Sequence, residues 1–188
     1  FTTDAGERLK ITIDTDVLQY IATRADSSNM GASAGAISGN INMGTSGAPI
    51  VLTVANIVDK IVEAGQILDE ANIPTEGSWI VLPAWACSML KQGDLKRADL
   101  TGDSTGAIRT GLIGEVDNFT IYKSNSIYRV TDGNATAFYM PFGTKEAITF
   151  ASQLIKTENL RIQDSFGDYF RGLQVYGRAV VQPEAMGI

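Results

Sequence analysis

The sequence predicts an α+β fold, and three observations support this. Residues 1–24 and 53–72 carry apolar side chains at helical spacing. Residues 169–181 alternate apolar and polar side chains, which is typical of a β-strand. Short strand-like segments and helices follow one another without a βαβ rhythm, so a doubly wound parallel sheet is not expected.

The first predicted helix rests on apolar residues that recur at every fourth position. These are Phe1, Ala5, Leu9, Ile13, Val17 and Ile21. They predict one amphipathic helix to about Arg24, or two helices broken near Asp14. A strand over residues 9–13 is the alternative, because β-branched residues such as Thr12 and Ile13 form helices less readily.

Residues 27–49 are rich in Gly, Ser and Asn, and they predict a connector with little regular structure. Four apolar residues, Met30, Ile37, Ile41 and Met43, are expected to attach it to a neighbouring surface. Thr53 is the predicted N-cap of the second helix, which Asn72 and Pro74 end.

The second half of the chain predicts short elements. The expected order is a buried strand over 79–82, a helix from Pro83 to Gln92, a long loop over 93–118, strands over 119–122 and 126–130, a turn at Asp132-Gly133 into 137–140, an ambiguous segment over 145–154, and a long strand over 169–181. The strands from residue 119 onward predict a small antiparallel sheet.

Length and composition limit the possible classes of protein. A chain of 188 residues suits one domain, or one domain with an extended appendage. No run of about eighteen apolar residues is present to span a membrane. The net charge of −6 gives no basic field for nucleic acid. The chain begins with Phe and shows no secretory signal, so we expect an internal fragment or a processed product.

The residue types argue against most enzyme chemistry. The chain has no His, which removes the commonest general base and metal ligand. Its single cysteine, Cys87, cannot form an internal disulfide and is expected to be a buried hydrophobe. Ser88 and Lys91 have the S-x-x-K spacing of serine acyl-transferases, but the partner motifs are missing. We therefore predict no catalytic residue, no cofactor and no metal site.

Two further patterns have ordinary explanations. The glycine-rich tract over residues 102–114 lacks the following Lys-Ser or Lys-Thr of a phosphate-binding loop, so a plain loop is favoured. The acid pairs Asp14/Asp16 and Asp69/Glu70 could share a proton or bind a cation, but solvated helix ends are the ordinary interpretation.

Charges of both signs surround aromatic residues near the C-terminus. The candidates for contact between subunits are Arg161, Asp168, Phe170, Arg171 and Arg178. Arginine and aromatic side chains are enriched at interface cores, and paired charges set the register between partners. The alternative is a solvated sheet face with a few aromatic residues in the core.

The order of several short segments resembles the major capsid proteins of tailed bacteriophages, which have the Hong Kong 97 fold. The segments are Leu68-Asp69-Glu70 with Pro74, Trp79 to Ala84, Leu90-Lys91-Gln92, Asp94-Leu95-Lys96, Leu100 to Asp103, Tyr122 to Asn125, Ala147 to Gln153 and Arg171 to Gly177. The resemblance covers roughly residues 50–188, and none of its segments is a chemical signature.

The resemblance implies a shell subunit with two lobes. A peripheral lobe, with a long helix and a long-stranded sheet, would take residues 1–52; an axial lobe, with helices around a central sheet, would take 53–149; and 150–188 would complete both. It favours a subunit contact for the five candidates above. The implied partners are copies of the same chain in pentamers and hexamers, with scaffolding and portal proteins, and DNA packaged without sequence-specific binding.

The implied place is the virion, with assembly in the host cytoplasm. An encapsulin-like nanocompartment subunit is the main alternative function, and a carboxylate-only enzyme is a distant third. Capsid proteins of this family also have an N-terminal arm and an extended hairpin ahead of the long helix, and neither fits residues 1–30. We expect both to be absent or to lie upstream. The lysine and asparagine that some members cross-link cannot be aligned to positions here.

Overall fold

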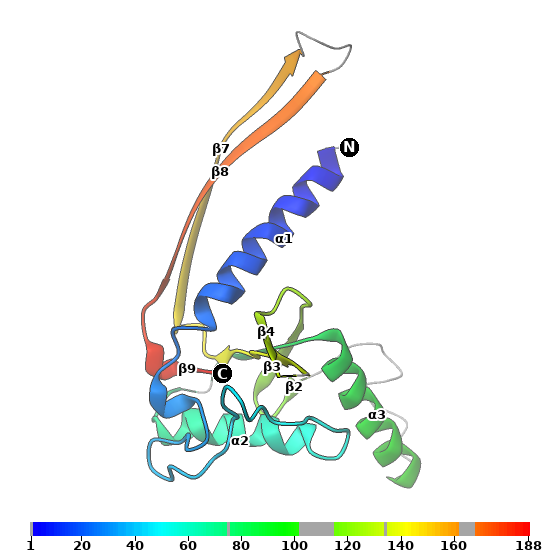
Figure 1. Cartoon of the computed structure of the whole chain (residues 1–188), viewed down its shortest axis with the longest axis vertical. Helices are drawn as coiled ribbons and strands as arrows, with labels where there is room; N and C mark the ends of the chain where they lie inside the picture. Colours follow the sequence, from blue (N-terminus) through cyan, green and yellow to red (C-terminus); the bar gives the residue numbers. More distant parts are fainter. Residues whose placement is uncertain (1, 75, 102–114, 134, 162–167) are drawn as a thin grey trace.

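The computed structural model describes residues 2–74, 76–101, 115–133, 135–161 and 168–188. It has a body at one end, from which helix α1 (Thr2–Ile21) and a ribbon of β7 (Ile148–Arg161) and β8 (Asp168–Val180) extend (Figure 1). The fold is α+β, as predicted. The molecule is therefore elongated, with its extended elements on one side of its body.

The body is organised around a five-stranded mixed sheet in the order β2-β3-β1-β6-β9. The strands are β1 (Ser78–Leu82), β2 (Glu115–Val116), β3 (Phe119–Lys123), β6 (Phe142–Gly143) and β9 (Met186–Gly187). β1 runs parallel to β3 and antiparallel to β6. The strand predicted over 79–82 is thus the centre of the sheet, and it is almost entirely buried, as its apolar run indicated.

Two helices cover this sheet. Helix α2 (Ile57–Glu70) buries Ile57, Ile61 and Leu68, so its predicted apolar face is confirmed. Helix α3 (Ala84–Thr101) follows β1 directly and buries Ala86, Cys87 and Leu90. Cys87 is therefore the buried hydrophobe that was expected, and burial raises the pKa of its thiol.

Four predictions in this region were wrong. Helix α2 begins at Ile57, not at Thr53, because Thr53 and Asn56 first close a turn through mutual side-chain to backbone hydrogen bonds of 2.7 and 3.3 Å. Helix α3 continues to Thr101, so residues 93–101 are not a loop. The segment over 126–128 is not a strand. The single antiparallel sheet predicted from residue 119 onward does not form, because β3 pairs in parallel with β1 whereas residues 129–132 and 135–138 pair only with each other; strands this short carry little pattern to predict their partners.

Helix α1 is one continuous helix, so neither the break near Asp14 nor the strand over 9–13 forms. The Thr12 and Thr15 hydroxyls donate to the carbonyls of Arg8 and Ile11 at 2.9 and 2.7 Å. Such back-bonding accommodates threonine within a helix. Only the later part of its apolar stripe is covered, because Ile13 and Ile21 are buried whereas Leu9 is partly exposed.

The connector over residues 27–49 contains one 3-10 turn (Ser27–Asn29) and isolated bridges, close to the prediction. Ala34 and Ile41 are buried against α2, and Met43 packs beside them. Ile37 does not attach the connector as expected, because it is 78% exposed. The turn around Ile37 is held instead by Glu70, whose carboxylate accepts the Ile37 and Ser38 amides at 3.0 and 2.8 Å.

A second, smaller hydrophobic cluster joins the extended elements to the body. It buries Ile21 at the end of α1, Ala147 before β7, and Ala185 and Met186 near the C-terminus. Ile148 and Val180, which pair at the start of the ribbon, pack against it. The ambiguous segment over 145–154 is mostly the first half of β7, a strand.

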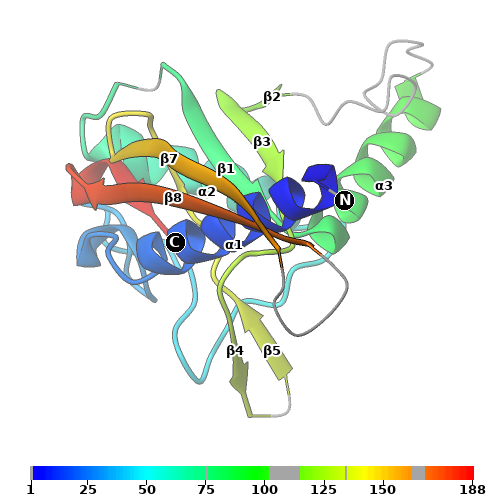
Figure 2. The same ribbon diagram turned by 90° about the horizontal axis from the view of Figure 1, so that it is seen from above.

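The remaining hairpin is formed by β4 (Arg129–Asp132) and β5 (Ala135–Phe138), which pair antiparallel around the predicted Asp132-Gly133 turn. Gly133 has a φ of +59°, a conformation that glycine adopts at little cost. The pair forms a separate two-stranded sheet that stands out from the body (Figure 2).

We expect Asn29→Ala to lower the free energy of unfolding by about 2–4 kcal/mol. The fully buried Asn29 amide donates to the carbonyls of Glu184 and Met186 at 2.6 and 3.1 Å, and its loss leaves both without that donor. Urea unfolding measures the change, with the exposed Asn40→Ala as the matched control. Equal stabilities for the two variants would contradict a structural role for Asn29.

Glu70 predicts a pH dependence. The Ser38 amide and then the Gln66 side chain lower its pKa from 4.5 to about 2. A lowered pKa stabilises the fold fully above the unfolded value, and this contribution is lost as the pH falls through the folded value. The stability difference between wild type and Glu70→Gln should therefore be largest above pH 4.5 and shrink toward pH 2. Urea titrations over this range test it, with Asp69→Asn as the control.

Candidate subunit interface

The ribbon of β7 and β8 extends away from the body of the protein (Figure 1). Its register runs from Ile148 paired with Val180 at the base to Arg161 paired with Asp168 at the far end, with one bulge between Leu154 and Lys156. Among the described residues the two strands pair only with each other, so the outer edge of each strand has no neighbouring strand there. Such edges are ready to pair with another chain.

Alternation gives β8 two different faces. Leu173, Val175 and the following Val181 lie on one face, and each is more than half exposed. Tyr176 and Arg178 lie on the other face, which is turned to α1. The apolar face that the sequence predicted is therefore the uncovered one, and the polar face makes the contact within the chain.

One carboxylate joins α1 to the ribbon. Asp16 Oδ2 accepts a 2.6 Å hydrogen bond from the Tyr176 hydroxyl and forms an ion pair with the Arg178 guanidinium. The same guanidinium lies 4.6 Å from the ring centroid of Tyr20, and that of Arg24 lies 4.4 Å from it. Cation–π contacts of this kind add to the ion pair. We call Asp16, Tyr20, Tyr176 and Arg178 the Asp16 cluster.

The five predicted contact residues divide into two places. Arg161, Asp168, Phe170 and Arg171 lie at the far end of the ribbon, whereas Arg178 lies near its base. Arg161 is exposed. Arg171 is also exposed, and its Nε and Nη2 donate to Glu158 Oε2 at 2.8 and 2.5 Å across the strands. Asp168 and Phe170 are placed by their strand positions, opposite Arg161 and Asn159.

Sequence reasoning missed two parts of this surface. Asp16 was interpreted as a solvated acid, although it forms the contact with Tyr176 and Arg178; its partners are about 160 residues away in the chain, so no local signal was present. Leu173 and Val175 were assigned to one face of a strand, and their spacing is the signal that could have marked them as contact residues.

The other sequence candidates fulfil local roles. The Ser88 hydroxyl donates to the Ala84 carbonyl at 3.0 Å, a bond within its own helix. Glu70 holds the connector turn described above.

The glycine-rich tract over 102–114 lies outside the described residues. In the parts of the chain that the structure describes, no group of three or more His, Cys, Asp or Glu residues is arranged to hold a metal ion. No helix there is long and apolar enough to cross a membrane.

Comparisons with known proteins agree on one class. The model of a phage capsid protein family matches residues 1–187. A solved structure titled "Mycobacterium phage Che8" superposes with a TM-score of 0.71 at 26% identity, covering 99% of this chain and 60% of that one. The structure titled "Capsid structure of the Cyanophage P-SCSP1u" gives 0.68 at 20% identity, covering 98% and 63%.

This chain therefore spans about three fifths of the length of the structures it matches. No curated protein matches it significantly.

The Asp16 cluster predicts a coupling between α1 and the ribbon. We expect Asp16→Asn to lower the free energy of unfolding by about 1–2 kcal/mol, between the values for an exposed ion pair and for a hydrogen bond to a charged group. Urea unfolding measures this, with the exposed Asp14→Asn as the control on the same helix.

A double-mutant cycle of Asp16→Asn and Arg178→Gln separates the pair from other effects. A coupling energy near zero would contradict a direct interaction. Hydrogen exchange should also show faster opening of β8 amides in Asp16→Asn than in Asp14→Asn.

Proposed function

The chain belongs to the phage capsid protein family, and we propose that it is a structural subunit of an icosahedral phage head shell. The observation that carries the proposal is the extended pair formed by α1 and the β7–β8 ribbon. Among the described residues it leaves two open strand edges, and it exposes Leu173 and Val175 in the middle of the ribbon. Surfaces of this kind are costly for a protein that remains alone, and useful for one with several neighbours.

We propose that the outer face of the ribbon contacts neighbouring copies. Arg171 shares that face with Leu173 and Val175, because odd-numbered positions of β8 point the same way. The far end adds Arg161, Asp168 and Phe170, whose charges and aromatic ring suit a contact that sets register. In this proposal Arg178 positions the ribbon, since its guanidinium is engaged with Asp16 and Tyr20 inside the subunit.

The two hydrophobic clusters support a division into two lobes. The larger cluster unites α2, α3 and the sheet, and the smaller one unites the base of α1 with the base of the ribbon. A peripheral lobe over 1–52, an axial lobe over 53–149 and completing strands over 150–188 remain our prediction. Ala34 and Ile41 of the connector pack on the larger cluster, so the connector would link the two lobes.

The proposed role is non-enzymatic. Each subunit would form several modest interfaces with copies of itself in pentamers and hexamers, and many weak contacts acting together would hold the shell. The net charge of −6 suits a container that does not bind packaged DNA tightly. Scaffolding and portal proteins are the other proposed partners, with assembly in the host cytoplasm and final residence in the virion.

The test is assembly of the intact gene product. We expect electron microscopy and light scattering to show closed particles, and we expect Leu173→Lys to reduce their yield strongly while circular dichroism stays unchanged. Val62→Lys is the matched control, because Val62 is an apolar residue of similar exposure on α2. A gene product that stays monomeric under every assembly condition would overturn the shell role. Normal assembly of Leu173→Lys would overturn the role of the ribbon face alone.

A further inference from the structure

The body contains a cavity of about 650 Å³ that the shell role does not use. It lies between α2, the connector and the β4–β5 hairpin, and its lining is predominantly apolar. Ile57, Ile61, Ala64 and Phe142 form its floor, and all four are at least 98% buried. The cavity therefore opens onto the main hydrophobic core of the body.

Its walls suit an aromatic or aliphatic guest. Met30, Met43 and Met140 line it, and methionine side chains adapt to irregular shapes. Trp85 and Phe138 also line it, with ring centroids 5.6 Å apart in an edge-to-face contact. Cavities that bind small molecules are typically about 300–1,000 Å³ and are lined in this way.

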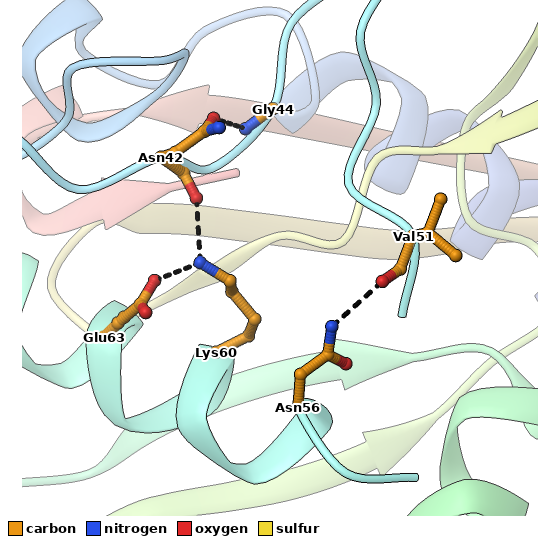
Figure 3. A network of polar contacts seen from close by, with 6 residues as sticks. All are labelled: Asn42, Gly44, Val51, Asn56, Lys60 and Glu63. Carbon is orange, nitrogen blue, oxygen red and sulfur yellow. Dashed lines mark hydrogen bonds and ion pairs between the residues drawn. The ribbon is translucent and has the colours of Figure 1, made fainter. Parts of the chain in front are cut away.

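A strap formed by residues 42–51 crosses one side of the cavity. Figure 3 shows how its ends are tied to the N-cap residue and the first turn of α2. The Lys60 ammonium donates to the Asn42 carbonyl at 3.2 Å, and the Asn56 amide donates to the Val51 carbonyl at 3.0 Å. Lys60 is itself held by an ion pair with Glu63. The strap is therefore fixed at its ends.

The middle of the strap is held differently. The Gly47 amide donates to Asp132 Oδ2 on the β4–β5 hairpin at 2.6 Å. Gly44 and Gly47 have φ values of +91° and +89°, so this part of the strap depends on glycine conformations. Releasing the Gly47–Asp132 hydrogen bond would loosen the strap from the hairpin while both ends stay bonded at the start of α2.

We propose that this cavity is a binding site for one small, uncharged, mainly apolar molecule, and that the strap is its movable cover. Protein interiors are close-packed, and an apolar space of this size beside the core is available for a guest. The two charged side chains among the lining residues, Lys60 and Asp132, are of opposite sign and already engaged, so an uncharged guest is favoured. The site is independent of the shell role.

The test uses N-phenyl-1-naphthylamine, an uncharged fluorescent probe. We expect saturable binding of one molecule per chain. In methyl-labelled protein, the resonances of Ile57, Ile61 and Met140 should shift during the titration, whereas those of Ile21 and Met186 in the second cluster should not. Equal shifts in both clusters, or no shift of the cavity methyl resonances, would contradict binding of the probe in the cavity.

Two variants sharpen the test. Ala137→Trp fills the cavity from β5 and should weaken binding by at least about tenfold, which corresponds to about 1.4 kcal/mol. The control is Ala151→Trp, the same change on an exposed position of the ribbon. Equal affinities in the two variants would contradict binding of the probe in the cavity.

Asp132→Ala removes the contact to Gly47 and should speed probe association in stopped-flow measurements. An unchanged association rate would contradict the role of the strap as a movable cover.

Discussion

A helix and a two-stranded ribbon that leave the body of a protein bury little surface of their own, and this constraint governs the architecture. Isolated helices and hairpins are marginal in water. Here both elements are anchored at their bases, where Ile21, Ala147 and Met186 form a small cluster. The Asp16 cluster then ties the two together beyond that base, through Tyr176 and Arg178. The orientation of the exposed ribbon depends on these two contacts.

The polarity of the ribbon explains its outward surface. The polar face of β8 is used within the chain, because Tyr176 and Arg178 meet a carboxylate on α1. This leaves Leu173 and Val175 on the face turned away. A protein that functioned alone would gain by covering these residues. In the proposed shell role, the same arrangement would leave the apolar area for neighbouring copies, while the charges hold the ribbon against α1.

The body is built differently, from long-range contacts around one central strand. β1 pairs with β3 and β6, which follow it in the chain. Phe119 of β3 and Phe142 of β6 meet edge to face, with ring centroids 6.2 Å apart. The β4–β5 hairpin stands outside this packed region, whereas the connector packs onto it through Ala34 and Ile41, and the cavity lies between the hairpin and the connector. The body thus combines a tightly packed centre with a looser side.

Local patterns in the sequence determined what depends on neighbouring residues alone. The spacing of apolar residues predicted α1 and α2, the alternation over 169–181 predicted β8, and the Asp132-Gly133 pair predicted the hairpin turn. The predicted ends of elements were less accurate: α3 is longer than expected and α2 starts later, because helix ends also depend on packing and on side-chain hydrogen bonds.

Tertiary structure alone decided which faces are covered. The periodicity of β8 defines two faces but does not say which one meets α1, because the partner residue Asp16 is far away in the chain. The five candidates were identified by residue type, whereas the pairing of β7 with β8 places Arg161, Asp168, Phe170 and Arg171 at the far end of the ribbon and Arg178 near its base. The spacing of apolar residues reflects the geometry of one helix or strand. Which other element packs against each face depends on the packing of the whole chain.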